Sequence, residues 1–311
     1  MKPKAINRRQ FIKTGAALSA GSIFGPRLLS GFSQSGSPVQ LAVVKGTDFV
    51  EITKRAVQAI GGIGKYVPAG SKVAILANPQ HNNPGSYTSP QVIRAVIQLC
   101  KEARADKIGF PGWLPLRNWR NTGSASVIKQ EDVKLEITDE RAEEEFEPVD
   151  VPEGVILKQA RLIKTLKKYD VLINIAICKG HSGDNFSGAL KSLMGLNSPK
   201  SDQSFHKKDW TLLTDDMEYL DQCIADLNTV IHPALTILDA TVFLLTNGPF
   251  GPGELARENA VLASVDRVAV DAYCTRFFGM RPQDSFAVVA AHKHGLGEMD
   301  LTKVKIKAIE I

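Results

Sequence analysis

Short apolar runs alternate with amphipathic segments along the first third of the chain. The runs "VQLAVVKG" (39–46), "SKVAILAN" (71–78) and "DKIGF" (106–110) each have the length and composition of a buried strand. Between them, apolar residues recur at helical spacing over Phe49–Ile60 and again after Pro90, which is typical of a first helical residue. Strands that alternate with helices predict an α/β fold with a mostly parallel sheet and helical crossovers. In such sheets, ligands bind beyond the carboxyl ends of the strands.

The pattern changes between Gly112 and Asp150. From Glu131 to Asp150 the chain holds ten acidic and two basic residues, with one alternating apolar run at Val133, Leu135 and Ile137. This composition predicts a strand or hairpin insertion, at about 112–150, with a solvated acidic rim. A functional acidic tract is the alternative. A helix is expected next, over Leu157–Lys168.

The remaining pattern completes one domain over 39–311. The run Val171–Ile177 is apolar apart from Asn174, as expected of a strand that is covered on both faces. "ALTILDAT" (234–241) and "AVLASVD" (260–266) predict two more strands, and a helix is expected over Arg267–Phe278.

Residues 1–38 differ in character from the rest. Arg8 and Arg9 precede Phe11 and a short stretch of alanine, leucine, glycine and serine, and a Ser/Gly-rich linker follows. This segment resembles a twin-arginine export leader, and its apolar stretch is too short for an ordinary spanning helix. We therefore expect export by the twin-arginine machinery to the periplasm or cell envelope, with no stable membrane span after cleavage. A basic amphipathic N-terminus is the alternative.

Charge and cysteine usage exclude two classes of function. The net charge of +5 comes from the leader, because the six basic residues of 1–30 have no acidic counterpart and their removal leaves 32 basic against 33 acidic residues. A nucleic-acid partner therefore has no electrostatic support. Cys100, Cys178, Cys223 and Cys274 form no C-x-x-C pair, which argues against a cysteine-ligated iron–sulfur cluster within this chain. Buried, small apolar cysteines are the expectation, although export would permit a disulfide.

The strongest chemical signal follows the strand Val171–Ile177. Lys179, Gly180 and His181 come directly after this strand, and Gly183, Ser187 and Gly188 lead into a second apolar segment that carries Lys191. A glycine-rich turn between strand and helix exposes backbone N–H groups, and two lysines beside it would favour an anionic ligand. Ala189 stands where a nucleotide-binding P-loop requires lysine, so that motif is rejected. The alternative is a turn capped by Ser187, with both lysines in water.

Other polar residues near strand ends are candidates of the second rank. His181 is expected to act as an acid/base group, or as a metal ligand together with His206, although the spacing fits no closed zinc pattern. Asn78, Asp239 and Asp271 follow or face apolar runs and are candidate ligand-binding residues. We expect Asp266 to cap the helix that contains Asp271. His292 and His294 are expected at the surface or at the rim of the site.

Several stretches in this order resemble the domain-of-unknown-function family 362 of bacteria and archaea. They are "PGSYTSPQVIRAVIQLCKEA", "DVLINIAICKGH" with "SGALKSLMGL", His206, "ILDATVFLLTNGPFGPG" and "VLASVDRVAVDAYCTRFFGM". The resemblance runs from about Val39 to the C-terminus. It implies shared positions at Lys179, His181, Gly188, Lys191, Gly195, His206, Asp239, Gly248, Pro249, Gly253, Asp266 and Asp271.

Two positions depart from the family pattern. Leu76-Ala77-Asn78 stands where the family usually has Lys-Pro-Asn, and Phe110 stands where it tends to have an acid after glycine. The ferredoxin modules of many relatives are also absent from this chain. The sequence therefore predicts an exported enzyme that binds a small anionic substrate or cofactor. Its reaction could be a redox reaction or be assisted by a metal. The alternative is a non-catalytic periplasmic ligand-binding or accessory protein, which the two departures favour.

Overall fold

An eight-stranded sheet forms the centre of the computed structural model, which describes residues 40–181, 185–206, 208–209, 214–215 and 217–311. Its strands, in spatial order, are β16 (Ile306–Glu310), β1 (Leu41–Lys45), β15 (Ala260–Ser264), β12 (Leu235–Ala240), β7 (Val171–Ile177), β2 (Lys72–Ala77), β3 (Lys107–Gly112) and β4 (Lys134–Ile137). All neighbouring pairs are parallel except those of β15, which runs antiparallel to β1 and β12. The predicted α/β fold with a mostly parallel sheet is confirmed.

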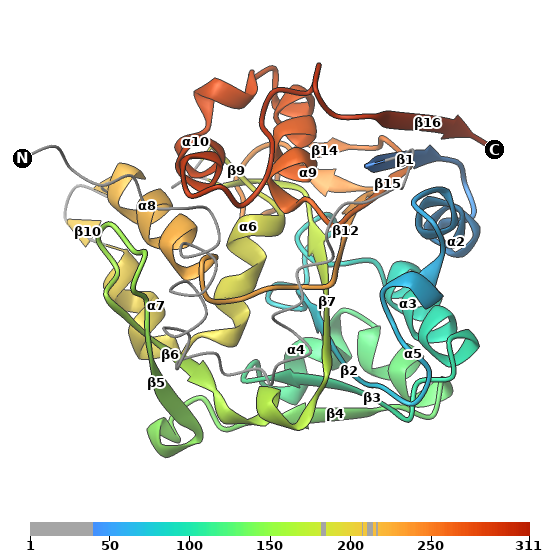
Figure 1. The fold of residues 1–311 in the computed structure, drawn as a ribbon, viewed down its shortest axis with the longest axis horizontal. Helices are drawn as coiled ribbons and strands as arrows, with labels where there is room; N and C mark the ends of the chain where they lie inside the picture. Colours follow the sequence, from blue (N-terminus) through green and yellow to red (C-terminus); the bar gives the residue numbers. More distant parts are fainter. Residues whose placement is uncertain (1–39, 182–184, 207, 210–213, 216) are drawn as a thin grey trace, which may run out of the picture.

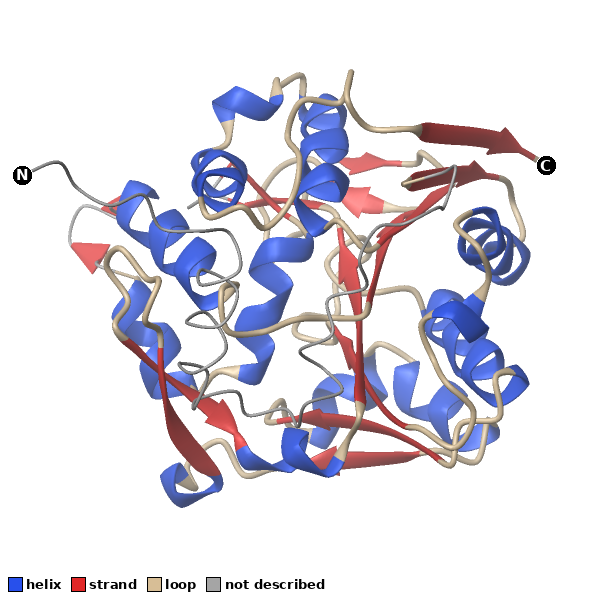
Figure 2. Ribbon diagram, in the orientation of Figure 1, coloured by secondary structure: helices blue, strands red, loops and turns tan. Residues whose placement is uncertain are grey.

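Helices cover both faces of this sheet (Figures 1 and 2). One face packs against α2 (Phe49–Ala59), α3 (Pro90–Glu102) and α5 (Ser124–Gln130), and the other against α6 (Ala189–Ser192), α8 (Met217–Leu227), α9 (Arg267–Cys274) and α10 (Phe286–Lys293). In β7, Ile173 and Ile175 belong to the first core, whereas Leu172 and Ala176 belong to the second. Because side chains of a strand alternate between faces, a strand covered twice is mostly apolar, which explains the apolar run in the sequence. Its one polar residue, Asn174, is buried; its amide donates to the carbonyl of Ala189 and accepts from the hydroxyl of Ser192.

The chain from Gly112 to Lys168 differs from its prediction. The alternating run forms β4, the edge strand of the central sheet, which is reached from β3 through α4 (Leu116–Asn121) and α5. A hairpin does occur, but it joins β5 (Phe146–Asp150) to β6 (Gln159–Ile163). The expected helix over Leu157–Lys168 is therefore wrong, because β6 and a short 3₁₀ helix over Lys164–Lys168 occupy that stretch. Ala160 and Leu162 are buried at every second position, which is the period of a strand.

The order of the strands creates a crevice between β2 and β7. From β2 the chain passes through α3 to β3, which lies beside β2 on the side away from β7. From β7 the chain continues to β12, which lies beside β7 on the side away from β2. Ala77 at the end of β2 pairs with Ile175 of β7, so both strands end at the same edge. Such switch points leave an open crevice outside the carboxyl ends of the strands, where ligands of α/β proteins bind.

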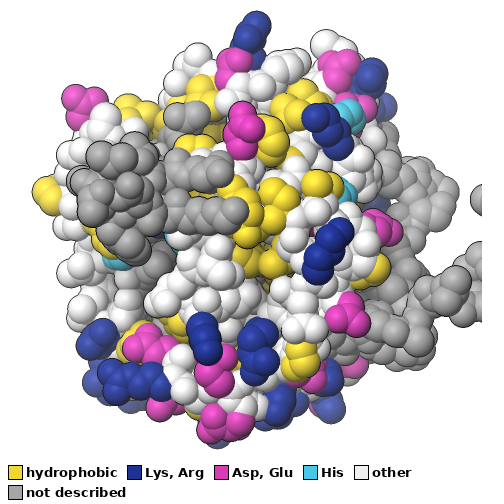
Figure 3. Space-filling model, turned by 90° about the vertical axis from the view of Figure 1, so that its left-hand side faces the viewer, with side chains coloured by type: hydrophobic (Ala, Val, Ile, Leu, Met, Phe, Trp, Pro, Cys, Tyr) yellow, Lys and Arg dark blue, Asp and Glu magenta, His cyan; other side chains and the backbone are white. Residues whose placement is uncertain are grey.

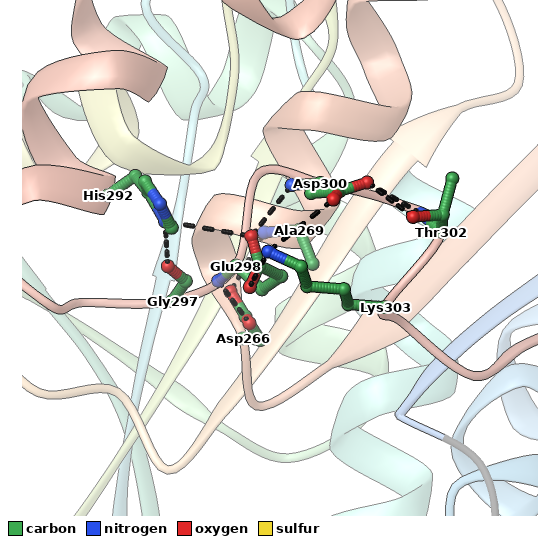
Figure 4. A network of polar contacts seen from close by, with 8 residues as sticks. All are labelled: Asp266, Ala269, His292, Gly297, Glu298, Asp300, Thr302 and Lys303. Atoms are coloured by element: carbon green, nitrogen blue, oxygen red, sulfur yellow. Dashed lines mark hydrogen bonds and ion pairs between the residues drawn. The ribbon is translucent and has the colours of Figure 1, made fainter.

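Asp266 caps α9 as predicted and also holds the chain that follows α10. Its carboxylate accepts hydrogen bonds from the backbone N of Ala269 and of Glu298, at 2.8 Å each. The Glu298 side chain lies 3.9 Å from the Lys303 Nζ and 3.8 Å from His292, and it accepts from the backbone N of Asp300 (Figure 4). This network fastens the C-terminal segment to the start of α9.

His294 corrects the expectation that both late histidines lie at the surface or at the rim of the site. Its side chain is only 10% exposed, and its Nε2 lies 2.8 Å from the carboxylate of Asp226, which is fully buried. The same carboxylate accepts from the backbone N of Ile156 and Leu157, at 2.7 and 2.8 Å. The pair therefore ties the β5–β6 hairpin to α8 and to the end of α10. His292 remains partly exposed, with a hydrogen bond to the carbonyl of Gly297.

The four cysteines are buried and carry free thiols. No helix among the described residues has the length and apolar character needed to cross a membrane. The twin-arginine segment and its linker lie outside the described residues. Figure 3 shows the face that carries α7 (Pro199–Phe205), α8 and the β5–β6 hairpin, where basic and acidic side chains lie intermixed along the lower edge.

Candidate functional site

A cavity of about 800 Å³ opens at the carboxyl ends of β2, β3 and β7. Six residues that the sequence analysis selected lie on its wall: Asn78, Lys179, His181, Ser187, Lys191 and His206. Gly195 and Pro249, which the family resemblance implied, lie there as well. The cavity thus gathers the predicted cationic residues at the crevice that the strand order creates.

Lys179 is the most unusual residue of this wall. Only 1% of it is exposed, and its Nζ donates a hydrogen bond of 2.7 Å to the carbonyl of Ser86, in the loop that follows β2. Its side chain therefore bridges the crevice from the end of β7. Burial, aided by the charge of Lys191, lowers the pKa of Lys179 from 10.5 to about 7. An amine with such a pKa exchanges a proton easily at neutral pH.

The predicted glycine-rich turn is a β-hairpin. Strands β8 (Lys179–His181) and β9 (Asn185–Ser187) pair antiparallel, with Lys179 opposite Ser187. Gly183, which was predicted to bind the ligand, lies outside the described residues. Gly180 does not line the cavity, because the backbone of the 243–256 segment packs against it: a Cβ at Gly180 would lie 2.4 Å from the carbonyl O of Leu245. A Cβ at Gly248 would lie 1.6 Å from the Gly180 carbonyl O, so both glycines serve close backbone contact.

The carboxylate of Asp271 binds backbone N–H groups for which the sequence predicts a ligand anion. Its carboxylate accepts hydrogen bonds from the backbone N of Ala189, at 2.6 Å, and of Leu190, at 2.9 Å, at the start of α6. Gly188 makes this contact feasible, since a Cβ there would lie 2.3 Å from Asp271 Oδ1. Neither residue lines the cavity. The protein thus supplies its own anion to these N–H groups. The ligand-binding prediction for Gly188 and Asp271 stays a prediction.

Asp239 is likewise engaged inside the protein. This buried carboxylate accepts from the backbone N of Ser89 at 2.7 Å, and from the backbone N and Oγ1 of Thr241 at 2.9 and 2.6 Å. Burial raises the pKa of Asp239, and these hydrogen bonds partly oppose that effect. Asp239 joins the end of β12 to the start of α3 and lies behind the cavity wall, not on it.

Helix α7 adds a carboxylic acid that the sequence analysis missed. Asp202 lines the cavity one helical turn before His206, and its Oδ1 accepts from Nδ2 of Asn197 at 2.8 Å. Burial raises the pKa of Asp202 well above 3.8, while the Asn197 bond and the Lys191 charge oppose the rise. The i, i+4 spacing of Asp202 and His206 is the sequence signal that would have revealed it.

The metal prediction for His181 and His206 gains no third ligand. Both histidines line the cavity. Within the described parts of the chain, however, no group of three or more His, Cys, Asp and Glu side chains is arranged to hold a metal ion. A metal-assisted reaction therefore stays a prediction.

Aromatic side chains were also missed. Trp113 follows β3 directly, and Phe250 lies in the "NGPFGPGE" loop; both line the cavity. The ring of Phe250 is 4.5 Å from the imidazole of His81, in an edge-to-face arrangement. Burial and the charge of Lys179 lower the pKa of His81 to about 4, so this imidazole is neutral at pH 7. These residues come from three separate loops, and only their convergence marks them as functional.

The acidic segment reaches the cavity rim through a few residues. Glu140, Arg141 and Glu143 line it, and Arg161 of β6 holds Glu143 in an ion pair of 3.3 Å. These three residues therefore add charges of both signs to a wall that also carries Lys179, Lys191, two histidines and Asp202. Such an arrangement favours a small anion inside and supplies an amine for proton transfer beside it.

Comparison with known proteins places the chain in a family. Among solved structures, the lactate racemase apoprotein from Thermoanaerobacterium thermosaccharolyticum is similar at 17% identity and a TM-score of 0.47, over 75% of this chain and 56% of that one. A protein from Thermotoga maritima is similar at 13% identity and a TM-score of 0.39, over 62% and 51% of the two chains. This chain thus spans about half the length of both. A comparison with proteins of curated function finds no match. The model of the family described as "Domain of unknown function (DUF362)" matches residues 72–276, well over half of the chain, so the protein belongs to this family.

Proposed function

We propose that this protein is an enzyme that binds a small anionic substrate or cofactor in the strand-end cavity and uses Lys179 for proton transfer. The observation that carries this proposal is a lysine that is 1% exposed, lines a cavity of about 800 Å³ and has a pKa lowered to about 7. Fully buried lysines without a carboxylate partner are rare in proteins. Strongly shifted pKa values in a cleft are typical of catalytic groups.

The neighbouring residues divide the remaining tasks. Lys191 and His181 neutralise the charge of the bound anion, since both lie on the cavity wall with Lys179. Asp202, whose pKa is raised and which lines the same cavity, serves as a proton donor. A redox or metal-assisted version of the reaction would use His181 and His206 as ligands.

The cellular setting is part of the proposal. Arg8 and Arg9 with the weakly apolar stretch after them support export in the folded state by the twin-arginine machinery. The protein would then act in the periplasm or cell envelope, on a small anion and without a nucleic-acid partner.

A second candidate function, binding without chemistry, is favoured by one residue. Leu76 lines the cavity at the position where the family usually has lysine, so a cation is missing from the wall itself. The departure at Phe110 does not favour the binding function. Its side chain is 1% exposed and packs edge-to-face on Trp119 in the core, so this departure does not alter the cavity.

Turnover is expected to rise with pH through about 7, because only the neutral amine of Lys179 accepts a proton. Incubation with a mixture of small carboxylates and phosphate esters, followed by mass spectrometry, identifies the compound that is consumed. The pH dependence of kcat/KM for that compound then checks the prediction. Lys179→Met should lose at least about 100-fold in kcat/KM, and His181→Ala should weaken binding of the anion.

The outcomes separate the two functions. A compound that is retained in native mass spectrometry but never consumed supports a binding protein and contradicts the enzyme. An activity that persists in Lys179→Met removes this lysine from the mechanism. Elemental analysis of the same samples tests the metal version, which requires stoichiometric metal that is lost in a His181→Ala, His206→Ala double variant.

A further inference from the structure

Strand β4 ends the central sheet on the side opposite β16 (Figure 1), and it pairs with β3 alone among the described strands. The backbone N of Thr138, the residue after β4, donates to a carbonyl of β3 at 2.8 Å. Alternate residues of a strand turn their backbone groups toward the same neighbour, so Lys134 and Glu136 also face β3. The backbone N–H and C=O groups of Leu135 and Ile137 therefore point away from the sheet.

This outer edge is open in the described part of the chain. No described segment other than β3 forms a hydrogen bond with the backbone of Leu135 or Ile137. The Ile137 side chain is 36% exposed, and Lys134 is exposed and has no ion pair among the described residues. An edge strand whose outer backbone groups are unpaired is a template for pairing with a further strand.

The sequence of this edge, from Val133 to Ile137, is complementary to itself. In an antiparallel pair with a two-fold axis at Leu135, Lys134 lies opposite Glu136 of the second copy, and Val133 lies opposite Ile137. Leu135 and Ile137 then take hydrogen-bonded positions, as their outward backbone groups require. Lys134 and Glu136 take the other positions, where facing side chains lie closest and opposite charges attract.

The two charges favour this register over its neighbours. A lysine on an edge strand usually discourages association, because a second copy brings a like charge close to it. That would hold here if the axis moved by one residue, which places Lys134 opposite Lys134 or Glu136 opposite Glu136. The Glu136 side chain pairs with Lys107 of β3 but stays 24% exposed, so its charge is accessible to a second cation. Of the three registers, only the one centred on Leu135 pairs opposite charges.

We propose that two copies of this chain associate by antiparallel pairing of their β4 strands, which joins the two central sheets into one continuous sheet. The interface is isologous, with Leu135 on the axis and a Lys134–Glu136 pair on either side of it. No residue of β4 lines the cavity, so this inference is independent of the proposed function.

Sedimentation velocity of the full chain over a range of concentrations tests the proposal. We expect a monomer–dimer equilibrium in the wild type. Lys134→Glu places two like-charged pairs in the interface and should raise the dissociation constant of the dimer at least about tenfold. High salt should reduce the difference between variant and wild type, because screening weakens both the attraction and the repulsion.

Two further variants locate the interface. Leu135→Pro removes an outward N–H and no donor to β3, a change that edge strands tolerate, and it should abolish the dimer. Lys307→Glu makes the same charge change as Lys134→Glu on β16, the opposite edge of the sheet, and should leave the dissociation constant unchanged. Far-UV circular dichroism checks that each variant is folded. If Leu135→Pro does not fold, Lys134→Glu and its control decide.

Three results would overturn the proposal. A wild type that stays monomeric at every concentration means that no second copy occupies this edge, whether the edge is free or covered by residues 1–38. A dimer that keeps the wild-type dissociation constant in Lys134→Glu and in Leu135→Pro has its interface elsewhere. A dimer that Lys307→Glu weakens as strongly as Lys134→Glu depends on the net charge of the chain or on β16, and not on β4.

Discussion

Replacement of Lys179 by methionine is expected to raise the free energy of unfolding at about pH 6 by several kcal/mol. The reason is that the folded protein holds this ammonium group almost fully out of water, with 1% exposure and a pKa lowered from 10.5 to about 7. Such a shift corresponds to about 5 kcal/mol. Loss of the hydrogen bond to the Ser86 carbonyl offsets about 1 kcal/mol of this increase in the free energy of unfolding. Methionine has a similar length and carries no charge.

The gain should shrink as the pH rises. A lysine with a lowered folded-state pKa binds fewer protons in the folded than in the unfolded chain between about pH 7 and 10.5, so wild-type stability increases with pH in that window. Below about pH 7 the cost is fully present. We therefore expect the difference between variant and wild type to fall by about 2–3 kcal/mol from about pH 6 to about pH 9.

Denaturant unfolding of both proteins at the two pH values measures this difference. The exposed Lys307 of β16 offers a matched control, because Lys307→Met removes the same charge from water-exposed surface. The control should show no comparable gain at either pH. A Lys179→Met protein that is less stable than wild type at about pH 6 would contradict the account.

Asp271→Ala is expected to lower the free energy of unfolding by about 3–5 kcal/mol. The substitution leaves the buried backbone N–H groups of Ala189 and Leu190 without their carboxylate partner, at a site that is 2% exposed. Because these groups begin the segment that carries Lys191, binding of small anions in the cavity should weaken as well. Equilibrium unfolding and anion titration on the same variant measure both effects.

Two further variants serve as controls for the effect of Asp271→Ala on stability. Asp271→Asn keeps the shape and one acceptor oxygen, so it should lose about half as much stability as Asp271→Ala. Asp284→Asn, on an exposed ion pair with Arg281, should cause no measurable change. If Asp271→Ala is as stable as wild type, the carboxylate does not hold α6.

The central sheet could be predicted from the sequence because its strands are covered on both faces. The apolar run of Val171–Ile177, interrupted only by Asn174, and the proline signal at Pro90 are local, so they can be recognised without knowledge of the partners. Strand pairing is not local. The residues of β4 were recognised as a strand, but their place beside β3 depends on a crossover of two helices. The stretch Gln159–Ile163 was misread because a short amphipathic segment fits both periods.

In the candidate site, too, residues with a local signal could be predicted, whereas residues whose role depends on tertiary contacts could not. Lys179, His181 and Lys191 were selected because strand ends of α/β sheets collect functional residues, and the structure brings them to one cavity. Asp271 was ambiguous, because a carboxylate near apolar residues can meet a ligand or a helix start. Its true partners lie 82 and 81 positions away in the chain.

The aromatic residues lay beyond prediction for a physical reason. Trp113 and Phe250 are more than a hundred positions apart, and neither sits in a motif that separates it from an ordinary core residue. Only the packed structure shows that one has a buried N–H without an acceptor in the described part of the chain and that the other is exposed beside the cavity.

The most direct test of the account is the titration of Lys179 itself. In protein labelled with ¹³C and ¹⁵N at lysine, the signal of the Lys179 ε-CH₂ group is assigned as the one that Lys179→Met lacks, and its shift is followed against pH. We predict a midpoint of about 7, far below the 10.5 of an ordinary lysine. A midpoint near 10.5 would mean that this lysine is an ordinary cation, and the proposed proton-transfer role would fall.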